Sequence, residues 1–262
     1  MKLAIFGASG RMGQAVARLA QAAGDVQIVG AITSADDPQL GRDLGEVAGI
    51  GFLGVELSCD VTAGLLGAQV VIDFSNASAV YPLFSACEKL GVALVSGTTG
   101  LDDKAQNKLE QVSQKVAVVW TANMSRGVQV LAELVSQAVA RLGLDFDVEI
   151  VEVHHRRKVD SPSGTAIRLA DAAREARSEL REVRGRDGNV GPRQSEEMGV
   201  FGIRGGDVIG DHTGHLIGDS ERLELTHRAT NRDLFARGAL SAAYFAAKKG
   251  PGRYTIADVL GA

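Results

Sequence analysis

The chain is poor in aromatic residues, proline and cysteine. Only 5% of its 262 residues are aromatic and 45% are hydrophobic, so a large core must be built from alanine, valine, leucine and isoleucine. Together with 32 glycines, this composition favours helices packed on a parallel sheet over a β-sandwich. The chain is longer than a usual single domain, and we therefore expect two domains.

Long hydrophobic runs and a strong charge of either sign are also missing. The N-terminal apolar run ends at Gly7, too early for a signal peptide, and no run approaches the ~20 apolar residues of a membrane-spanning helix. The formal net charge of −4 argues against nucleic acid or an anionic membrane as partner. Cys59 and Cys87 form no C-x-x-C pair, so we expect two reduced, buried thiols. These features predict a soluble, cytoplasmic protein.

Short β-branched runs alternate with helical patterns in the first half of the chain. Continuous apolar strands of this kind are typical of a parallel sheet that is covered on both faces. We expect strands at 3–6, 26–32, 70–74, 92–96 and 116–120, and helices at 11–23, 77–90 and 102–115.

The pattern changes after Asn123. Three strands there follow one another without helices between them, which indicates a mixed or antiparallel sheet. We expect helices at 126–142, 163–181, 231–249 and 255–260, strands at 147–155, 199–204, 207–212 and 220–228, and a polar loop at 183–197.

A glycine-rich turn joins the first strand to the first helix. Gly7, Gly10 and Gly13 have the spacing G-x-x-G-x-x-G. Glycines at such a turn allow the sharp bend, the approach of a pyrophosphate to the backbone and close packing of the helix on the strand. The helix N-terminus then faces the phosphates. In this strand–turn–helix context the motif predicts a dinucleotide site, although tight turns elsewhere use the same residues.

The acidic residue expected at the end of the second strand is absent. Thr33 and Ser34 stand there, and Asp36 and Asp37 come a few residues later. An acid at this position binds the ribose diol and repels a 2′-phosphate. Its absence, with Arg11 nearby, favours NADPH over NADH.

A second group of ionisable residues ends the strand at 147–155. The run from Glu152 to Lys158 is rich in histidine, arginine and lysine, and a helix begins soon afterwards, with Ser163 as its N-cap. A solvated basic loop is one interpretation of the run. Basic side chains that face a helix N-terminus form an anion site, however, and this arrangement suits carboxylates.

The histidines also raise the alternative of a metal site. His154 and His155 are neighbours on a strand and point to opposite faces, so both cannot easily bind one ion. His212 and His215 form another possible pair. We expect no bound metal, and we expect a structural role for His227.

With these motifs in view, the chain resembles the dihydrodipicolinate reductase (4-hydroxy-tetrahydrodipicolinate reductase) family over nearly its whole length. The segment from His154 to Thr165 is specific to that family. The resemblance rests on Gly7–Gly13, Asp73–Ser75, Gly97–Gly100, Asn123–Ser125 with Gly127, Glu152–Thr165, Gly205–Thr213 and Glu221–His227.

The resemblance implies an α/β fold: an N-terminal Rossmann-type parallel-sheet domain, residues 1–125, completed by C-terminal helices within 231–262. An α+β domain, residues 126–230, would bind substrate and form a homotetramer. The implied activity is the NADPH- or NADH-dependent reduction of a small cyclic dicarboxylate imine on the diaminopimelate route to lysine.

The resemblance also assigns roles to particular residues. His154 matches the family's acid/base and Lys158 its proton donor, while His155, Gly164 and Thr165 match the residues that hold the substrate carboxylates. The implied cofactor-binding residues are Gly7, Ala8, Ser9, Gly10, Arg11, Met12, Thr33, Ser34, Gly97, Thr98, Thr99, Thr121, Ala122, Asn123 and Met124.

Three departures from the family pattern stand out. An acid is often found where this chain has Thr33, Asp211 replaces a common glutamate, and Met124 replaces a common phenylalanine. Two alternatives remain at this stage. One is a related oxidoreductase of aspartate-dehydrogenase type, and the other is a nucleotide sensor without catalytic activity. The catalytic interpretation requires the glycine turn and the His154–Lys158 cluster to face one cavity.

Overall fold

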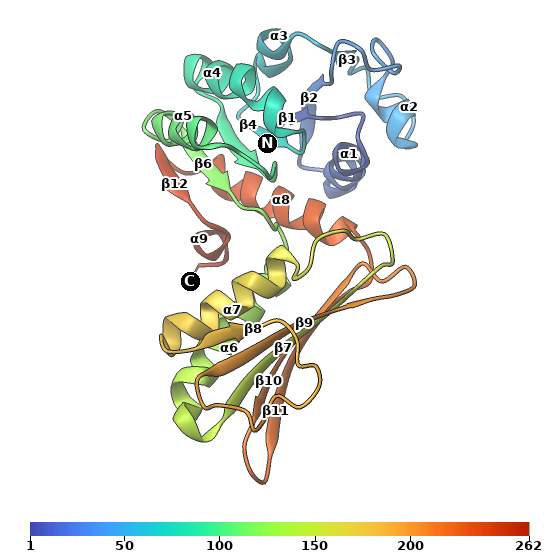
Figure 1. Ribbon diagram of the computed structural model, residues 1–262. Coiled ribbons are helices and arrows are strands. Elements are labelled where there is room, and N and C mark those ends of the chain that lie inside the picture. The colour runs from blue at the N-terminus through green and yellow to red at the C-terminus, as the bar shows by residue number, and fades with distance from the viewer. Residues whose placement is uncertain (262) are drawn as a thin grey trace. The chain divides into compact units, whose positions relative to one another are not determined.

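The computed structural model describes residues 1–261, in which seven strands form one parallel sheet (Figure 1). The strand order is β12-β6-β5-β4-β1-β2-β3. The chain leaves β1 for β2 on one side and later returns to β4 on the other, which is the Rossmann arrangement. The strands are β1 (Lys2–Phe6), β2 (Gln27–Ile32), β3 (Leu57–Ser58), β4 (Val70–Asp73), β5 (Ala93–Ser96), β6 (Ala117–Trp120) and β12 (Gly252–Tyr254).

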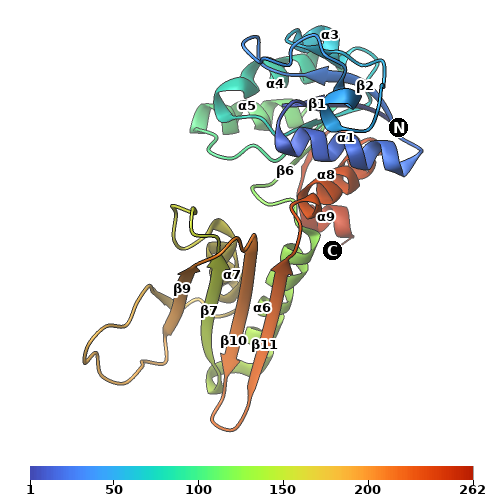
Figure 2. The same cartoon turned by 90° about the vertical axis from the view of Figure 1, so that its right-hand side faces the viewer.

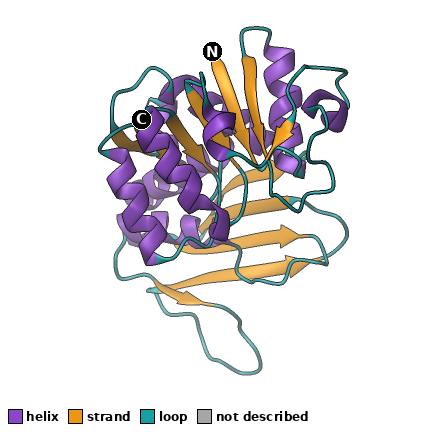
Figure 3. Ribbon diagram, turned by 90° about the horizontal axis from the view of Figure 1, so that it is seen from above, coloured by secondary structure: helices purple, strands orange, loops and turns teal. Residues whose placement is uncertain are grey.

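Helices cover both faces of this sheet. Figure 2 shows α4 on one face, with α1 and α8 on the other, and Figure 3 shows the strands fanning out side by side. The helices are α1 (Arg11–Ala23), α2 (Leu44–Ala48), α3 (Val61–Leu65), α4 (Val80–Leu90), α5 (Asp103–Ser113), α8 (Asp233–Ala246) and α9 (Ile256–Leu260), with a 3₁₀ turn η1 (Ala77–Ala79) before α4.

The alternation of side chains along β1 explains the two layers. Leu3 and Ile5 belong to the core beneath α1 and α8, whereas Ala4 and Phe6 belong to the core beneath α4 and α5. Successive strand residues point to opposite faces, so a strand that is apolar throughout is stable only with helices on both sides. This confirms the parallel, doubly covered sheet expected from the sequence.

The chain divides into two units, which are described separately. Unit 1 comprises Met1–Ser125 and the described residues from Asp233 onward, and unit 2 comprises Arg126–Arg232. Helix α8 is a central part of unit 1 and packs against β4, β5 and β6. At Gly238 of this helix, a Cβ would lie 1.7 Å from the Met124 carbonyl oxygen, so only glycine allows the helix to approach so closely.

Unit 2 contains a mixed sheet in the order β11-β10-β7-β9-β8. β7 is antiparallel to β10 and parallel to β9, and this confirms the expectation of a mixed or antiparallel sheet. The elements are α6 (Arg126–Leu142), the 3₁₀ turn η2 (Gly143–Asp145), β7 (Asp147–His154), α7 (Gly164–Ala176), β8 (Arg181–Val183), β9 (Glu197–Arg204), β10 (Gly210–Ile217) and β11 (Arg222–Ala229).

Helices α6 and α7 pack on one face of this sheet. Along β7, Val148, Ile150, Glu152 and His154 are buried, and the residues between them are half-buried. The last two buried residues of this strand, Glu152 and His154, are therefore ionisable. Like the apolar residues before them, they point to the face of the sheet that the helices cover.

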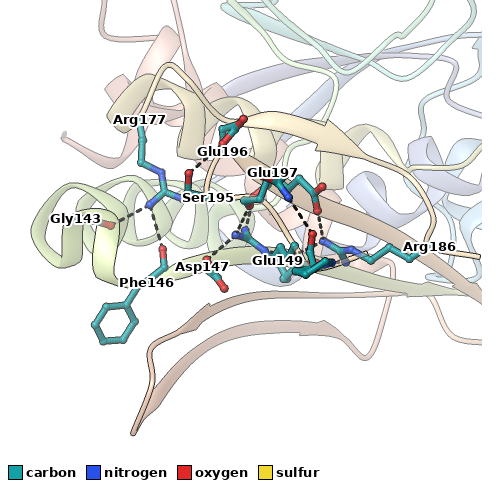
Figure 4. A network of polar contacts seen from close by, with 12 residues as sticks. Gly143, Phe146, Asp147, Glu149, Arg177, Arg186, Ser195, Glu196 and Glu197 are labelled. Atoms are coloured by element: carbon teal, nitrogen blue, oxygen red, sulfur yellow. Dashed lines mark hydrogen bonds and ion pairs between the residues drawn. The ribbon is translucent and has the colours of Figure 1, made fainter. Parts of the chain in front are cut away.

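Arginines tie the loop 184–196 to the other face of the sheet. Arg186 donates to Glu149 Oε1 at 3.0 Å and to Glu197 Oε2 at 3.2 Å (Figure 4). Arg193 also donates to Glu149 Oε1, at 3.1 Å. Burial raises the pKa of Glu149, but the hydrogen bonds and charges of the two arginines outweigh it, so the pKa is lowered and the side chain is ionised at neutral pH.

Some boundaries differ from the sequence-based prediction. The helix expected to reach residue 181 ends at Ala176, because Arg177 is extended and its guanidinium donates to the Gly143 and Phe146 carbonyls (Figure 4). The strand expected at 207–212 runs from Gly210 to Ile217 and pairs with both of its neighbours along that length. The short elements β3, β8, β12, α2 and α3 were not expected from the sequence.

Two further findings concern the expectations drawn from composition. Cys87 is buried as expected, but Cys59 is exposed, because it follows the two-residue strand β3 at the edge of the sheet. Through residue 261, no helix combines the length and the apolar character needed to span a bilayer.

Candidate functional site

The predicted cofactor-binding residues lie in the loops that follow β1, β2, β5 and β6, except Arg11 and Met12, which begin α1. Because these strands are parallel, their carboxyl ends meet at one edge of the sheet. Ligands of open α/β sheets bind outside this edge, where the chain turns in opposite directions from neighbouring strands. The fold of unit 1 therefore brings these loops to the edge at which a dinucleotide binds.

The glycine turn has the geometry of a phosphate-binding loop. Gly7 has a φ of +76°, and its N–H and that of Ala8 both donate to the Ile32 carbonyl at 2.9 Å. At Gly13, a Cβ would lie 2.3 Å from the Gly7 carbonyl oxygen, so α1 packs directly on the turn. Gly10 caps α1 without a side-chain acceptor. The turn and the N–H groups that begin α1 thus fit a pyrophosphate.

Other predicted residues of this set serve the fold as well. The Thr98 hydroxyl donates to Asp73 Oδ2 at 2.9 Å, and the Thr98 carbonyl accepts from Trp120 Nε1 at 3.0 Å. Met124 is 1% exposed and packs in the core of unit 1. These two side chains point inward, so their contribution to a bound ligand is limited to the backbone. Thr99 and Ala122 are exposed at the same edge of the sheet.

The loop after β2 contains the Asp37 carboxylate. In the sequence, Asp37 comes several residues later than the acid expected at the end of this strand. The Asp37 carboxylate accepts hydrogen bonds from Ser9 and Thr33, two of the predicted cofactor-binding residues. These bonds lower the pKa of Asp37, that from Ser9 first, so the group is ionised at neutral pH. Ser34, also predicted to bind the cofactor, is exposed beside this cluster.

In unit 2, the buried carboxylate of Glu152 connects several of the predicted residues. Its side chain is 0% exposed and accepts two bonds from Arg204, each of 2.7 Å, and one of 3.1 Å from the Ser163 N–H. Burial raises the pKa of Glu152, but hydrogen bonds from Arg204 and His154 outweigh it and lower the pKa. Glu152 is therefore ionised, and each of its oxygens accepts two hydrogen bonds.

The fourth of these bonds orients His154. Nδ1 of His154 lies 2.5 Å from Glu152 Oε2. Because an ionised carboxylate only accepts, Nδ1 carries a hydrogen and the proton that can be exchanged is the one on Nε2. At Gly210, a Cβ would lie 2.9 Å from that Nε2, so glycine keeps this atom accessible. The arrangement is that of an acid/base histidine held in one tautomer by a carboxylate.

A second histidine packs edge-on against the first. The ring centroids of His154 and His212 are 5.1 Å apart, and His212 Nε2 lies 3.0 Å from the Ser163 hydroxyl. Burial, followed by the charge of His154, lowers the pKa of His212 to about 3. His212 therefore stays neutral at physiological pH. It supports His154 and the Ser163 cap and does not compete with His154 for protons.

The N-terminus of α7 begins beside this cluster. Ser163 caps the helix by accepting from the Ala166 N–H at 3.2 Å, and Gly164 and Thr165 are its first two residues. The first N–H groups of a helix have no intrahelical acceptor, so they bind anions. Apart from the adjoining residues and the backbone of α7 itself, no described heavy atom lies within 4 Å of the place where a Gly164 side chain would begin. Glu152 and His212 thus tie the helix end to His154.

The remaining basic residues lie on the loop after β7. Both oxygens of Asp160 accept from Lys158 Nζ at 2.8 Å, and the charge of Lys158 contributes to the lowered pKa of His212. The Lys158 N–H also donates to the His155 carbonyl at 3.1 Å, which keeps Lys158 beside the end of β7. Burial, and then the charges of Arg232 and Arg157, lower the pKa of His155. The structure thus gathers all five predicted catalytic and substrate-binding residues at one end of unit 2.

The sequence predicts Ser163 as the cap of α7 and offers His212 only as part of a possible metal pair, and it assigns no role to Glu152, Arg204 or Gly210. Glu152 lies two residues before His154, a spacing that puts both on one face of a strand. That spacing is a signal that could have been used. Arg204 comes from another strand, so no local pattern indicates it. Through residue 261, no group of three or more histidine, cysteine or acidic residues is placed to hold a metal ion.

Comparison with protein families gives two matches that together span nearly the whole chain. The model described as dihydrodipicolinate reductase, N-terminus, matches residues 1–124, and the model described as dihydrodipicolinate reductase, C-terminus, matches residues 127–260. Both predicted motif regions lie inside these matches.

Curated relatives agree. A 4-hydroxy-tetrahydrodipicolinate reductase of Anaeromyxobacter dehalogenans is 45% identical over 99% of this chain and 97% of the relative. One of Methanopyrus kandleri is also 45% identical, over 98% of this chain and 95% of the relative. Among solved structures, a dipicolinate-bound dihydrodipicolinate reductase from Paenisporosarcina sp. TG-14 has a TM-score of 0.78 at 21% identity and covers 97% of each chain. An amine dehydrogenase from Mycobacterium smegmatis shares the fold, with a TM-score of 0.64 at 15% identity over 98% of this chain and 95% of that one.

Proposed function

The chain belongs to the dihydrodipicolinate reductase family, and from this premise we propose that it reduces 4-hydroxy-tetrahydrodipicolinate to tetrahydrodipicolinate with NADH or NADPH, on the diaminopimelate route to lysine. The observation that carries the proposal is the buried Glu152 carboxylate, which holds both His154 and the N-terminus of α7. One end of unit 2 thereby combines an acid/base group with a carboxylate-binding group.

The dinucleotide binds, in this proposal, at the carboxyl edge of the sheet in unit 1. The turn from Gly7 to Met12 holds the pyrophosphate, and the loops 97–99 and 121–124 hold the nicotinamide end. The reduced nicotinamide supplies the hydride when it is bound. Ser9 and Thr33 contribute hydroxyl groups at the ribose end of the site.

Unit 2 neutralises the two carboxylates of the substrate. The backbone N–H groups of Gly164 and Thr165, at the start of α7, donate hydrogen bonds to one carboxylate. His155 and Lys158 contribute polar and positive groups for the other. Positive charge around the substrate stabilises its carboxylates when it binds. The same charge stabilises the electron density that the ring gains on hydride transfer, so it favours both binding and reaction.

The proton is delivered by His154. Loss of the 4-hydroxyl as water, with a proton from the adjacent ring carbon, leaves a conjugated imine, and addition of hydride to that system generates an electron-rich enamine carbon that must be protonated. Nε2 of His154 donates this proton, while Nδ1 remains bonded to Glu152, which keeps the ring oriented. Lys158, whose N–H donates to the His155 carbonyl, serves as a second proton donor and a positive charge.

Replacing Lys158 with methionine should lower kcat/KM by about 10²–10⁴-fold, with part of the loss in KM. Methionine keeps the length of the chain and removes the charge that we assign to the substrate. Steady-state kinetics at fixed dinucleotide concentration measure the effect. Arg156→Met, on the same exposed loop, is the matched control. Equal losses of kcat/KM in the two variants would contradict a specific role for Lys158 and leave it as one of several positive charges on the loop.

The activity itself is tested by the loss of absorbance of NADH and NADPH. Substrate is generated in the cuvette from pyruvate and aspartate semialdehyde by the preceding synthase. Turnover with this substrate, and none with oxaloacetate plus ammonia, is the expected result. The reverse pattern would assign the chain to an enzyme of aspartate-dehydrogenase type. Dinucleotide binding without turnover of either substrate would make it a nucleotide sensor.

We propose a homotetramer in a reducing cytoplasm. On the face of the unit 2 sheet away from α6 and α7, Ile203 is 52% exposed and Ile217 is 40% exposed, and β11 is an edge strand. Exposed apolar side chains beside an open edge support association with further copies. The exposed thiol of Cys59 suits a reducing compartment. Sedimentation velocity tests the assembly, and a monomer at micromolar concentration would exclude it.

A further inference from the structure

The loop after β2 folds back on itself. β2 ends at Ile32, and a turn closed by a 3.1 Å bond from the Asp37 N–H to the Ser34 carbonyl reverses the chain. Asp37 therefore returns to the end of β2, although three residues separate it from Thr33. Its carboxylate reaches the place that an acidic residue at position 33 would occupy in a Rossmann fold.

Three hydrogen bonds hold the carboxylate there. Oδ2 accepts from the Ser9 hydroxyl at 2.5 Å and from the Thr33 hydroxyl at 2.6 Å, while Oδ1 accepts from the Gln39 N–H at 2.8 Å. Ser9 belongs to the glycine turn. The carboxylate is thus fixed between the pyrophosphate loop and the end of β2. Because a carboxylate oxygen accepts two hydrogen bonds, Oδ1 keeps one position for a further donor.

These contacts define what the carboxylate recognises. In a Rossmann fold the adenosine ribose lies between the glycine turn and the end of the second strand, and an acid there accepts from the ribose 2′-hydroxyl. NADPH carries a phosphate on this hydroxyl, which offers no donor and brings further negative charge. A fixed carboxylate at this point therefore favours NADH. Arg11 is exposed and, within residues 1–261, forms no ion pair with Asp37.

We propose that Asp37, standing in for the acid missing at position 33, makes this enzyme select NADH over NADPH by accepting from the adenosine ribose. The inference rests on the proposed dinucleotide site in unit 1 but not on the identity of the reduced substrate. It is opposite to the preference for NADPH that the sequence pattern alone favours, because that pattern considers only the residues directly after the strand.

The proposal is tested on binary complexes, by titrating the purified full-length protein with NADH and with NADPH and following the fluorescence of the bound nicotinamide. The unmodified protein should bind NADH at least about tenfold more tightly, the size expected for one like-charge contact. Added salt should narrow the gap, since it screens the repulsion of the 2′-phosphate. No turnover is needed for this measurement.

Asp37→Asn is the informative variant, because it removes the charge and keeps the shape and an accepting oxygen. Its affinity for NADPH should rise and the two dissociation constants should come close together. Asp36→Asn is the matched control: it removes the same charge from the neighbouring exposed residue and should leave the ratio unchanged.

The outcomes separate this inference from the proposed function. Equal binding of the two dinucleotides by the unmodified protein, an unchanged ratio in Asp37→Asn, or an equal change in Asp36→Asn would each overturn the role of Asp37 while the reductase assignment stands. Failure to bind either dinucleotide would overturn both. Tight, selective NADH binding without reduction of the cyclic imine would uphold Asp37 and reject the proposed substrate.

Discussion

Replacing His154 with alanine should lower kcat by about 10²–10⁴-fold while the protein remains folded, the range that general acid–base groups contribute. The reason is local: Nε2 is the one ring nitrogen that the Glu152 carboxylate leaves available for proton transfer. Hydride addition without a positioned donor must wait for a proton from water. Single-turnover and steady-state measurements of NADH oxidation give the change.

The control for this variant is His215→Ala on the opposite face of the same sheet. His215 lies on β10 and is half-buried, 3.6 Å from Glu224, so its loss removes an imidazole without touching the cluster. Circular dichroism and dinucleotide affinity report on folding in both variants. A kcat near normal in His154→Ala would remove this residue from the mechanism.

Replacing Glu152 with glutamine should reduce kcat at least tenfold and destabilise the protein by about 3 kcal/mol. That cost is the lower end for removing one partner of a buried ion pair, because the Arg204 side chain is 21% exposed. The kinetic loss follows from the tautomer: a neutral amide can donate to Nδ1 as well as accept from it, so His154 is no longer held in one form. Chemical denaturation and steady-state kinetics measure the two effects.

A double-mutant cycle separates positioning from general damage. If Glu152 acts through His154, the kinetic effect of Glu152→Gln should nearly vanish in the His154→Ala background, since residues that work as one unit are not additive. Losses that simply multiply in the double variant would contradict the positioning role. The affinity for NADH, which depends on unit 1, should be the same in all four proteins.

Glu152 also makes stability depend on pH. Its pKa is lower in the folded protein than in the unfolded chain, so the unfolded state binds more protons in acid. The corresponding stabilisation is complete above the unfolded pKa of about 4.3 and is lost as the pH falls through the lower folded value. The same denaturation series, repeated between pH 7 and pH 3, should therefore show a smaller fall for Glu152→Gln than for the unmodified protein.

Much of the fold was predictable because its signals are local. Helix boundaries at Arg11–Ala23 and Arg126–Leu142 were predicted to the residue, because apolar periodicity is strong there and a glycine follows each end. Strands β3 and β12 have two and three residues and too short a pattern to recognise. The end of α7 depends on the bonds from Arg177 to the carbonyls of Gly143 and Phe146, which no local pattern encodes.

Some residues of the candidate site were also predictable from local patterns, and others were brought to it only by the fold. The glycine turn, the ionisable run from Glu152 to Lys158 and the helix start at Ser163 are contiguous motifs that the sequence shows directly, whereas the roles of His154 and Lys158 came from the resemblance to the family. The contact between His154 and Glu152 could have been predicted from the alternation of side chains along the strand, but it was not. Arg204 and His212 reach the cluster from β9 and β10, about 50 residues away along the chain, so only sheet pairing brings them there.

The amino-acid order by itself determined the elements of this protein and the chemistry it carries, because turns, caps and side-chain alternation act over a few residues. Tertiary structure decided the ionisation, the tautomer and the hydrogen-bond partners of the side chains at the candidate site. It placed Arg204 against Glu152, which keeps that carboxylate ionised and His154 in one tautomer. It also turned Asp37 back to Ser9 and Thr33, where we propose that its charge meets the ribose of the dinucleotide. Hydrogen bonds and charge act through space, so the effect of a side chain depends on what the fold sets beside it.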